Sequence, residues 1–250
     1  MYSYSKVSCW WQCPYLYKLK YIDKLEEKFD EDPRNALLLG TAIHEGIETQ
    51  DIDKAINEYL SKYKEITPQH ELEVLKLKII LPIAIKQIPR GLNEEKILYH
   101  DFIGFIDLLV EVEDGIYDLY DYKYSANIGG YTKSGQIHLY KYFFEKQTGK
   151  KIRNLYYVFI PKDGTVLKEG LDFEETKKKV ESSLLSKNIR FEKIEYDPKQ
   201  ISQFFARKTL MEKDTEFNKR FSFSCRWCSF KKFCESKGLD RSEINEKTEI

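Results

Sequence analysis

Hydrophobic residues recur at helical spacing in two stretches in the first third of the chain. Residues 35–63 predict one or two helices, and residues 70–88 predict another helix that is interrupted at Pro82. The spacing then changes, because residues 97–113 and 116–125 are rich in Ile, Val, Tyr and Phe, which favour strands. The turn between these two stretches indicates a β-hairpin.

A helix and a strand follow the hairpin. Residues 134–149 predict a helix closed by Gly149, and residues 154–161 predict a buried strand. Strand, helix and strand in this order predict an α/β fold with a mixed central β-sheet flanked by helices. Residues 172–187 and 198–213 are amphipathic and predict two further helices.

The composition is that of a globular protein. The chain has 250 residues, of which 42% are hydrophobic and 33% charged, and its formal net charge is zero. Neutrality lowers the expectation of a nucleic-acid partner without excluding it, since a basic groove can coexist with acidic metal ligands. We see no membrane span or signal peptide and therefore expect a cytoplasmic protein. No domain boundary is visible, so we expect one domain over residues 1–240 and a frayed polar tail over residues 241–250.

Three residues of the hairpin carry candidate chemistry. Asp121 and Lys123 are two apart on one strand and therefore point to the same face. The position of Asp107, on the other strand, depends on the turn. A two-residue loop places Asp107 opposite Tyr122, whereas a three-residue loop with a bulge places it opposite Asp121, with Cβ atoms about 5 Å apart.

Two carboxylates at this spacing favour a metal site. They repel each other unless positive charge lies between them, and hard oxygen ligands suit Mg²⁺ or Mn²⁺. On the same face, Lys123 would be able to orient water or stabilise charge on a phosphate. The alternative is that Asp107, Asp121 and Lys123 are solvated residues on an exposed sheet face, the commoner fate of charged strand residues.

The order of the motifs resembles the RecB-like branch of the PD-(D/E)XK nuclease superfamily, which includes the AddB nuclease domain and the Cas-four family of CRISPR adaptation nucleases. The matching segments are SYSKVSCWWQCPYLYKLKY with Cys13, GTAIHEG with His44, GFID with Asp107, DYK with Asp121 and Lys123, and QIHLY with Gln136 and Tyr140. Together they span most of the chain. The superfamily more often has glutamate at the place of Asp121, although the RecB-like branch often carries aspartate there.

The resemblance implies a restriction-endonuclease-like core and metal-dependent DNA cleavage. By this resemblance the metal ligands are His44, Asp107, Asp121 and the backbone carbonyl of Tyr122, Lys123 helps to activate water, and Gln136 and Tyr140 lie near the catalytic site and the DNA strand. One or two Mg²⁺ or Mn²⁺ ions would polarise the phosphate. Because the last motif is associated with enzymes that process DNA ends, we expect an exonuclease acting on single-stranded or frayed DNA in recombination, repair or phage DNA processing. Glu48, one turn from His44, is expected to be solvated.

Three cysteines near the end of the chain form a soft-ligand motif. Cys225, Cys228 and Cys234 are separated by two and then five residues, which indicates a metal or cluster site that needs a fourth ligand. The resemblance implies that Cys13 is this ligand and that a 4Fe-4S cluster braces a helical region, joining segments near both ends of the chain. Cys9 is then the spare thiol. Zinc also suits four thiolates, and structural cysteines are a third possibility.

Aromatic residues flank these cysteines. They are Trp10, Trp11, Trp227, Phe230 and Phe233. We expect them to shield a cluster or fill a core and assign them no DNA role.

Three alternative functions are compatible with the same motifs. The first is a Cas-four-like nuclease that trims spacer precursors, and the second is a non-catalytic iron-sulfur module that binds DNA ends. The third is a zinc-bound structural protein. The intact set of His44, Asp107, Asp121 and Lys123 favours an enzyme, and a helicase, an integrase or another recombination protein is a possible partner.

Overall fold

The computed structural model describes residues 1–126, 128–168 and 170–245. The internal contacts of the chain group into two compact units. Unit 1 comprises Met1–Asp30, Asp101–Ile103 and Pro198–Ile250, and unit 2 comprises Glu31–His100 and Gly104–Asp197. The single domain over residues 1–240 stays a prediction.

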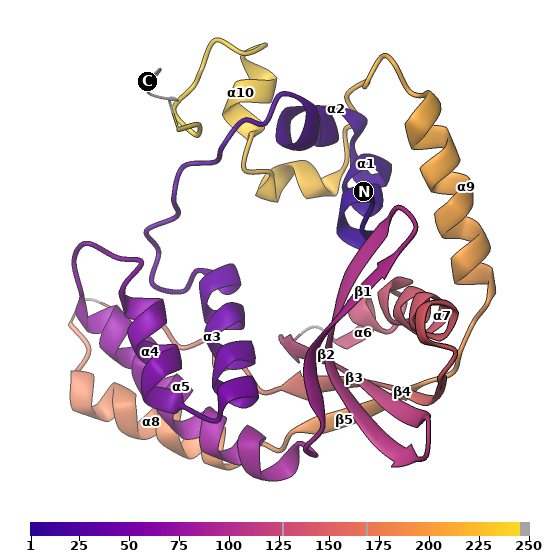
Figure 1. The fold of residues 1–250 in the computed structure, drawn as a ribbon. Helices are drawn as coiled ribbons and strands as arrows, with labels where there is room; N and C mark the ends of the chain where they lie inside the picture. Colours follow the sequence, from indigo (N-terminus) through magenta and orange to yellow (C-terminus); the bar gives the residue numbers. More distant parts are fainter. Residues whose placement is uncertain (127, 169, 246–250) are drawn as a thin grey trace. The chain divides into compact units, whose positions relative to one another are not determined.

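Unit 2 contains the sheet and the helices that cover it (Figure 1). Its elements are α3 (Ala36–Thr49), α4 (Ile52–Leu60), α5 (Pro68–Gln87), β1 (Leu92–Tyr99), β2 (Phe102–Glu113), β3 (Ile116–Tyr124), α6 (Ile128–Tyr131), α7 (Gln136–Thr148), β4 (Lys151–Ile160), α8 (Phe173–Leu185) and β5 (Arg190–Ile194). The first two residues of β2 group with unit 1. These elements confirm the predicted hairpin, the helix closed by Gly149 and the buried strand after it.

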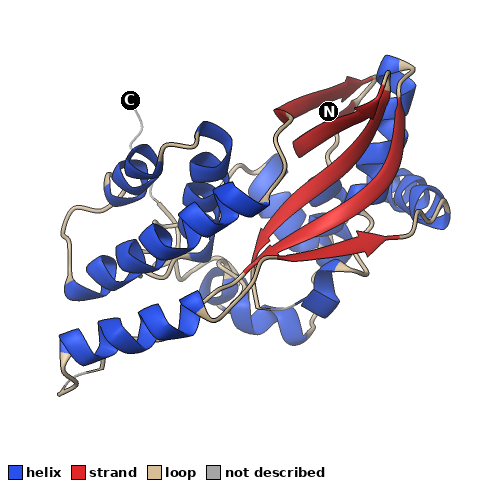
Figure 2. Ribbon diagram, turned by 90° about the horizontal axis from the view of Figure 1, so that it is seen from below, coloured by secondary structure: helices blue, strands red, loops and turns tan. Residues whose placement is uncertain are grey.

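The five strands form one sheet in the order β1-β2-β3-β4-β5, and Figure 2 shows them in red. Strand β3 pairs antiparallel with β2 and parallel with β4, and β5 pairs antiparallel with β4. The predicted mixed sheet flanked by helices is therefore confirmed. The short strand β5 was not predicted, because its sequence RFEKI has only two apolar residues in five positions and no regular alternation.

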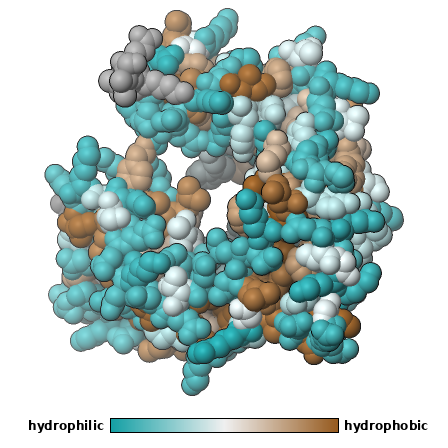
Figure 3. Space-filling view, in the orientation of Figure 1, coloured by the Kyte–Doolittle hydropathy of each residue, from teal (hydrophilic) through white to brown (hydrophobic). Residues whose placement is uncertain are grey.

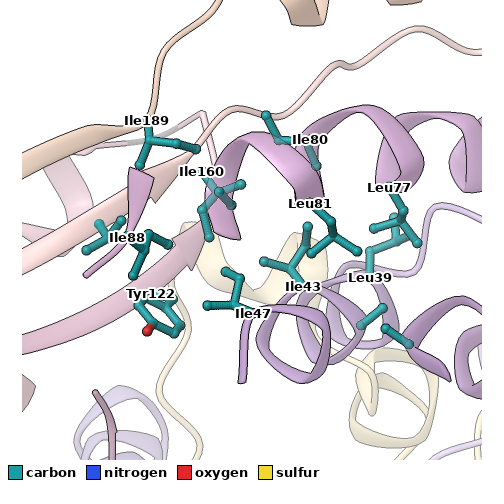
Figure 4. Packing of buried hydrophobic residues seen from close by; sticks show 14 of the residues in the cluster. Leu39, Ile43, Ile47, Leu77, Ile80, Leu81, Ile88, Tyr122, Ile160 and Ile189 are labelled. Carbon is teal, nitrogen blue, oxygen red and sulfur yellow. The ribbon is translucent and has the colours of Figure 1, made fainter. Parts of the chain in front are cut away.

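The main core of unit 2 lies between one face of the sheet and helices α3, α4 and α5 (Figure 4). From the sheet, Tyr122 and Ile160 point into it, and from the helices Ile43 and Leu81 do. Side chains alternate along a strand, so the even-numbered residues of β3 face this core and Asp121 and Lys123 face the other side of the sheet. On that other side, the ring of Tyr117 packs against Phe144 of α7 at 5.8 Å.

Helix α5 differs from its prediction, because it continues through Pro82. Proline lacks the N–H of a helical hydrogen bond and is costly inside a helix. Here the residues around it, Ile80, Leu81 and Ala84, are all fully buried against α3 and the sheet. Tertiary packing on both sides of Pro82 therefore outweighs the local penalty.

Unit 1 brings together segments from both ends of the chain. Its elements are α1 (Tyr4–Gln12), α2 (Pro14–Tyr17), the π-helical turn η1 (Lys18–Ile22), α9 (Lys199–Lys213), the 3₁₀ turn η2 (Phe223–Trp227) and α10 (Lys231–Glu235). The indole of Trp10 in α1 donates a 2.7 Å hydrogen bond to Asp214, directly after α9. Leu19 packs with Phe230 and Phe233 in a small buried cluster, so the two ends of the sequence share a core.

Part of the predicted polar tail is packed. Ile244 is 1% exposed and belongs to the cluster of Leu19. The backbone of residues 243–245 pairs with that of residues 26–28 through hydrogen bonds of 2.9 and 3.0 Å. The fraying expected from residue 241 is therefore wrong for residues 241–245, and the rest of the predicted tail, residues 246–250, lies outside the described residues.

The surface shown in Figure 3 is mainly hydrophilic, with hydrophobic residues in small scattered groups. Among the described residues, no helix is both long enough and apolar enough to cross a membrane.

The close approach of α3 to α5 yields the first testable prediction. A Cβ added at Gly46 would lie 2.7 Å from the Cδ2 atom of the buried Leu81, whereas a Cβ added at Gly40 in the same helix would meet no atom within 4 Å. Gly46→Ala should therefore lower the free energy of unfolding by about 1–3 kcal/mol, through overpacking. Gly40→Ala should raise it by up to about 1 kcal/mol, through helix propensity.

Urea denaturation of the two variants and the wild type measures both changes. An equal or greater stability of Gly46→Ala relative to Gly40→Ala would show that α3 and α5 do not pack this closely.

Candidate active site and cysteine site

The candidate active site of unit 2 depends on the register of the β2–β3 hairpin. Glu113 pairs with Ile116 across the two-residue turn, but from Glu111 onward the pairs follow a shifted register that ends at Leu108 opposite Tyr120. Val112 is thus a bulge, and the same register continued by one residue places Asp107 level with Asp121. The structure thus combines the two predicted arrangements of the hairpin. The loop has two residues, as in the first arrangement, but the bulge places Asp107 opposite Asp121, as in the second.

The carboxylate of Asp107 forms a hydrogen bond with the backbone of strand β3. Its Oδ2 accepts a 2.6 Å hydrogen bond from the backbone N–H of Tyr122, two residues beyond Tyr120, which belongs to the last pair of the β2–β3 ladder. Its Oδ1 lies 3.4 Å from Nδ1 of His44. Asp107 therefore connects the end of the hairpin to helix α3.

Helix α3 presents His44 to this carboxylate. The side chain of Asn35 caps the helix by accepting hydrogen bonds from the backbone N–H groups of residues 37 and 38, and Ile43 and Ile47 anchor the buried face. The ring of His44 also meets the ring of Tyr122 edge-on at 5.5 Å. Burial lowers the pKa of His44. The charge of Asp107 and its contact with the imidazole together raise the pKa by more than burial lowers it, so the pKa of His44 lies above its ordinary value.

Asp121 is buried on the opposite face of the sheet from the main core. It is 1% exposed, which contradicts the alternative of a solvated sheet face for this residue. Burial raises its pKa, and the charge of Asp107 adds to that effect, while Lys123 acts in the opposite direction. The Lys123 ammonium forms an ion pair with Asp121 Oδ2. No described residue donates a hydrogen bond of ordinary geometry to that oxygen.

Two tyrosine rings enclose the ammonium of Lys123. Its Nζ lies 5.5 Å from the ring centre of Tyr131 and 5.7 Å from that of Tyr157. Neither tyrosine was among the predicted site residues. Tyr157 could have been found had the parallel β3–β4 register been known, because it pairs with Asp121 across the two strands.

Helix α7 brings the last two predicted residues to the same side of the sheet. The side-chain N–H of Gln136 donates a 2.7 Å hydrogen bond to the hydroxyl oxygen of Tyr140. Burial raises the pKa of Tyr140, and the charges of Asp121 and Asp107 are close enough to raise it further. The predicted residues His44, Asp107, Asp121, Lys123, Gln136 and Tyr140 thus come together within unit 2. For Tyr122, the structure shows the amide and ring in contact with the site, and ligation by its carbonyl stays a prediction.

The predicted cysteine site lies in unit 1. Cys13, Cys225, Cys228 and Cys234 line one pocket, and Cys9 does not. Burial raises the pKa of Cys228, and the other three thiols of this set are close enough to raise it further. The backbone N–H of Ser222 also points at the Cys225 sulfur, at 3.4 Å. The resemblance selected the same four cysteines.

Comparison with known protein families identifies the family of the chain. The model of the PD-(D/E)XK nuclease superfamily matches residues 1–235. The chain belongs to the PD-(D/E)XK nuclease superfamily. The assignment of Asp121, Tyr122 and Lys123 to the acidic residue, variable residue and lysine of that signature stays a prediction.

The chain also resembles a solved structure. The crystal structure of a Putative exonuclease from Eubacterium rectale matches with a TM-score of 0.47 and 13% sequence identity, covering 89% of this chain and 91% of that one. No curated protein matches the chain.

Metal binding at Asp107 and Asp121 stays a prediction. Within residues 1–126, 128–168 and 170–245, no three His, Cys, Asp or Glu side chains are grouped so that they could hold a metal ion. The Lys123 ammonium and the Tyr122 amide instead contact Asp121 and Asp107. The hard carboxylate oxygens of Asp107 and Asp121 are nevertheless of the kind that suits Mg²⁺ or Mn²⁺.

Glu48 differs in part from its prediction. It is half-buried one helical turn from His44, and burial followed by the charge of Glu94 raises its pKa. The charge of His44 lowers it again, so the two side chains interact electrostatically. Glu48 is therefore not a freely solvated residue.

The electrostatic balance at His44 yields the second prediction. In Asp107→Asn the imidazole keeps its burial but loses the charge that raises its pKa. We expect the pKa of His44 to fall below the ordinary value of about 6.5 in metal-free protein. NMR titration of the four histidines measures this directly.

His70 and His138 serve as internal controls for this titration. Burial lowers the pKa of each, and Asp107 contributes to neither, so both should titrate unchanged. Because the pKa of His44 is raised in the folded protein, the His44–Asp107 contact stabilises the fold fully below about pH 6.5 and loses that effect as the pH rises through the raised pKa. A His44 pKa that does not move in Asp107→Asn would contradict the contact.

Proposed function

We propose that the protein is a metal-dependent DNA nuclease of the RecB-like kind that hydrolyses phosphodiester bonds from DNA ends. One observation carries the proposal: in a member of a nuclease superfamily, Asp121 is buried against Lys123 and level with Asp107. A buried carboxylate with a raised pKa destabilises the fold above that pKa unless positive charge compensates it. Such a costly arrangement is typical of functional sites.

The predicted ligands are His44, Asp107, Asp121 and the carbonyl of Tyr122. When bound there, Mg²⁺ or Mn²⁺ would supply Lewis acidity toward the scissile phosphate and the attacking water. His44 fits as a ligand, because its ring is held against Tyr122 with Nδ1 directed at Asp107. The backbone N–H of Tyr122 holds Asp107 in one orientation, so its remaining lone pairs are directed without further ordering.

Lys123 provides a fixed positive charge for the phosphate. Its ammonium is held by Asp121 and lies against the rings of Tyr131 and Tyr157, so it needs little reorganisation to stabilise charge that develops on a phosphate oxygen. The charges of Asp121 and Asp107 outweigh burial and raise the pKa of Lys123, so it remains a cation at neutral pH.

Tyr140 serves as a hydrogen-bond donor to the DNA strand. Gln136 donates to its hydroxyl oxygen, which leaves the phenol proton to be donated elsewhere. The raised pKa keeps that proton in place at neutral pH. Gln136 thereby positions Tyr140 and fits the role expected for both residues near the substrate.

Replacing either member of the buried Asp121–Lys123 pair should abolish most of the nuclease activity. Asp121→Asn and Lys123→Met should each reduce the cleavage of end-labelled linear single-stranded DNA in Mg²⁺ or Mn²⁺ by at least about 10²-fold. Asp114→Asn, in the exposed turn of the same hairpin, should cleave like the wild type. A covalently closed circle should resist all of them, because it offers no end.

A double variant separates catalysis from folding. Removing one partner of a buried ion pair costs about 3–5 kcal/mol, so either single variant is expected to unfold more easily. Asp121→Asn combined with Lys123→Met leaves no unpaired charge and should regain stability while remaining inactive. A well-folded wild type that cleaves no linear DNA in either metal would instead favour a non-catalytic module that binds DNA ends.

We propose further that Cys13, Cys225, Cys228 and Cys234 hold a 4Fe-4S cluster. Two features support this assignment: the four cysteines line the same pocket, and the backbone N–H of Ser222 is directed at the sulfur of Cys225. Cys9 fits the spare thiol, because it does not line the pocket that the other four cysteines share.

Metal analysis of anaerobically purified protein tests this assignment. We expect iron and acid-labile sulfide in the wild type and in Cys9→Ala, and their loss in Cys13→Ala and in Cys225→Ala. The two losing variants should also melt at a lower temperature, because the cluster joins distant parts of the chain. Stoichiometric zinc in colourless wild-type protein would overturn the cluster assignment and leave the cysteine set intact.

A further inference from the structure

The segment around Cys225 exposes large aromatic side chains that a folded protein normally buries. Phe221, Phe223 and Trp227 are 79%, 68% and 81% exposed. The expectation that the aromatic residues beside the cysteines are buried holds for Trp10, Phe230 and Phe233. It is wrong for Trp227 and for Trp11, which is 42% exposed. Three exposed aromatic rings within seven residues form an apolar patch that needs a partner.

The same segment is strongly basic. Between Glu216 and Asp240 the chain carries six basic residues and one acidic residue, a net charge of +5, although the whole chain is neutral. The guanidinium of Arg226 lies 4.6 Å from the ring centre of Phe223, and that of Arg220 lies 5.3 Å from the ring of Trp11. Arginine stacked on an exposed ring keeps its charge available to an anion.

A short 3₁₀ turn fixes these side chains. Side chains three residues apart lie on the same side of such a turn, which explains why Arg226 stacks on Phe223. The backbone N–H of Cys225 donates to Ser222 at 3.0 Å, and the N–H of Cys228 donates to Cys225 at 3.4 Å. Trp227 is therefore held between two cysteines on an ordered backbone.

We propose that Arg220, Phe221, Phe223, Arg226 and Trp227, together the aromatic–arginine turn, bind single-stranded nucleic acid. Unpaired bases would stack on the exposed rings, and the arginines would contact the phosphates. The net charge of +5 on this segment favours a polyanion as the ligand. The exposed rings favour a polyanion whose bases are unstacked, which is single-stranded nucleic acid. The inference rests on the proposed function only in taking DNA as the substrate.

Binding without cleavage tests the proposal. The full chain, purified anaerobically, is titrated in EDTA against a fluorescent oligothymidylate of about 16 nucleotides, with anisotropy as the signal. Trp227→Ala and Phe223→Ala should each weaken binding about 5- to 150-fold, the effect of losing one stacked base. Trp227→Phe should retain most of the affinity, because it keeps a stacking face.

Two controls isolate the turn. Leu239→Ala removes an apolar side chain that is 88% exposed in the same unit, and it should bind like the wild type. Arg226→Gln should reduce the dependence of affinity on salt concentration, because it removes a phosphate contact. Metal content and melting temperature are measured for every variant, so a lost cluster is not mistaken for a lost stacking surface.

The outcome is separable from that of the proposed function. In EDTA the wild type should bind the oligonucleotide without cleaving it, and turn-dependent binding by a protein that cleaves nothing in Mg²⁺ or Mn²⁺ would leave the inference standing. Wild-type affinity in both Trp227→Ala and Phe223→Ala would overturn it. Equal affinity for a blunt duplex would also overturn it.

Discussion

The structure of the candidate active site depends on holding two carboxylates level on one sheet. Asp107 and Asp121 repel each other, and Asp121 is buried, so the fold must supply both alignment and compensation. The bulge at Val112 supplies the alignment by shifting the hairpin register by one residue. Compensation comes from Lys123 beside Asp121 and from the amide of Tyr122 on Asp107. Without the bulge, Asp107 would face the other side of the sheet.

This constraint explains how the helices of unit 2 are arranged around the sheet. Helix α3 must reach Asp107 with His44, and it can do so because Gly46 allows it to lie close against Leu81 of α5. Helix α7 must cover the carboxylates from the other side, and there it contributes Gln136 and Tyr140 rather than purely apolar residues. Each helix thus combines a buried apolar stripe with one polar contact at the site. The packing that stabilises the fold also sets the orientation of the chemical groups.

Much of this arrangement was predictable from the sequence, and the failures have physical causes. The period of two in residues 116–125 predicts that Asp121 and Lys123 share a face, and Gly149 marks the end of α7. The register of the hairpin could not be predicted. The two-residue turn by itself would place Asp107 opposite Tyr122, and the bulge moves it back opposite Asp121, but nothing in the sequence marks the bulge. Local rules also break α5 at Pro82, where packing decides otherwise. The tyrosines around Lys123 come from other elements, and pattern along one strand carries no information about them.

The zero net charge of the chain conceals two opposed local charges, and this explains why composition was a weak guide to function. Unit 2 concentrates carboxylates at its site, which favours a cation and, through it, a phosphate. Residues 217–239 of unit 1 carry a net charge of +5 beside exposed rings. A uniformly basic protein would weaken a carboxylate site's attraction for Mg²⁺, whereas separate charges allow one chain to attract both a metal ion and a polyanion. Since the two charges lie in different parts of the sequence, their local distribution predicts the binding chemistry better than their sum.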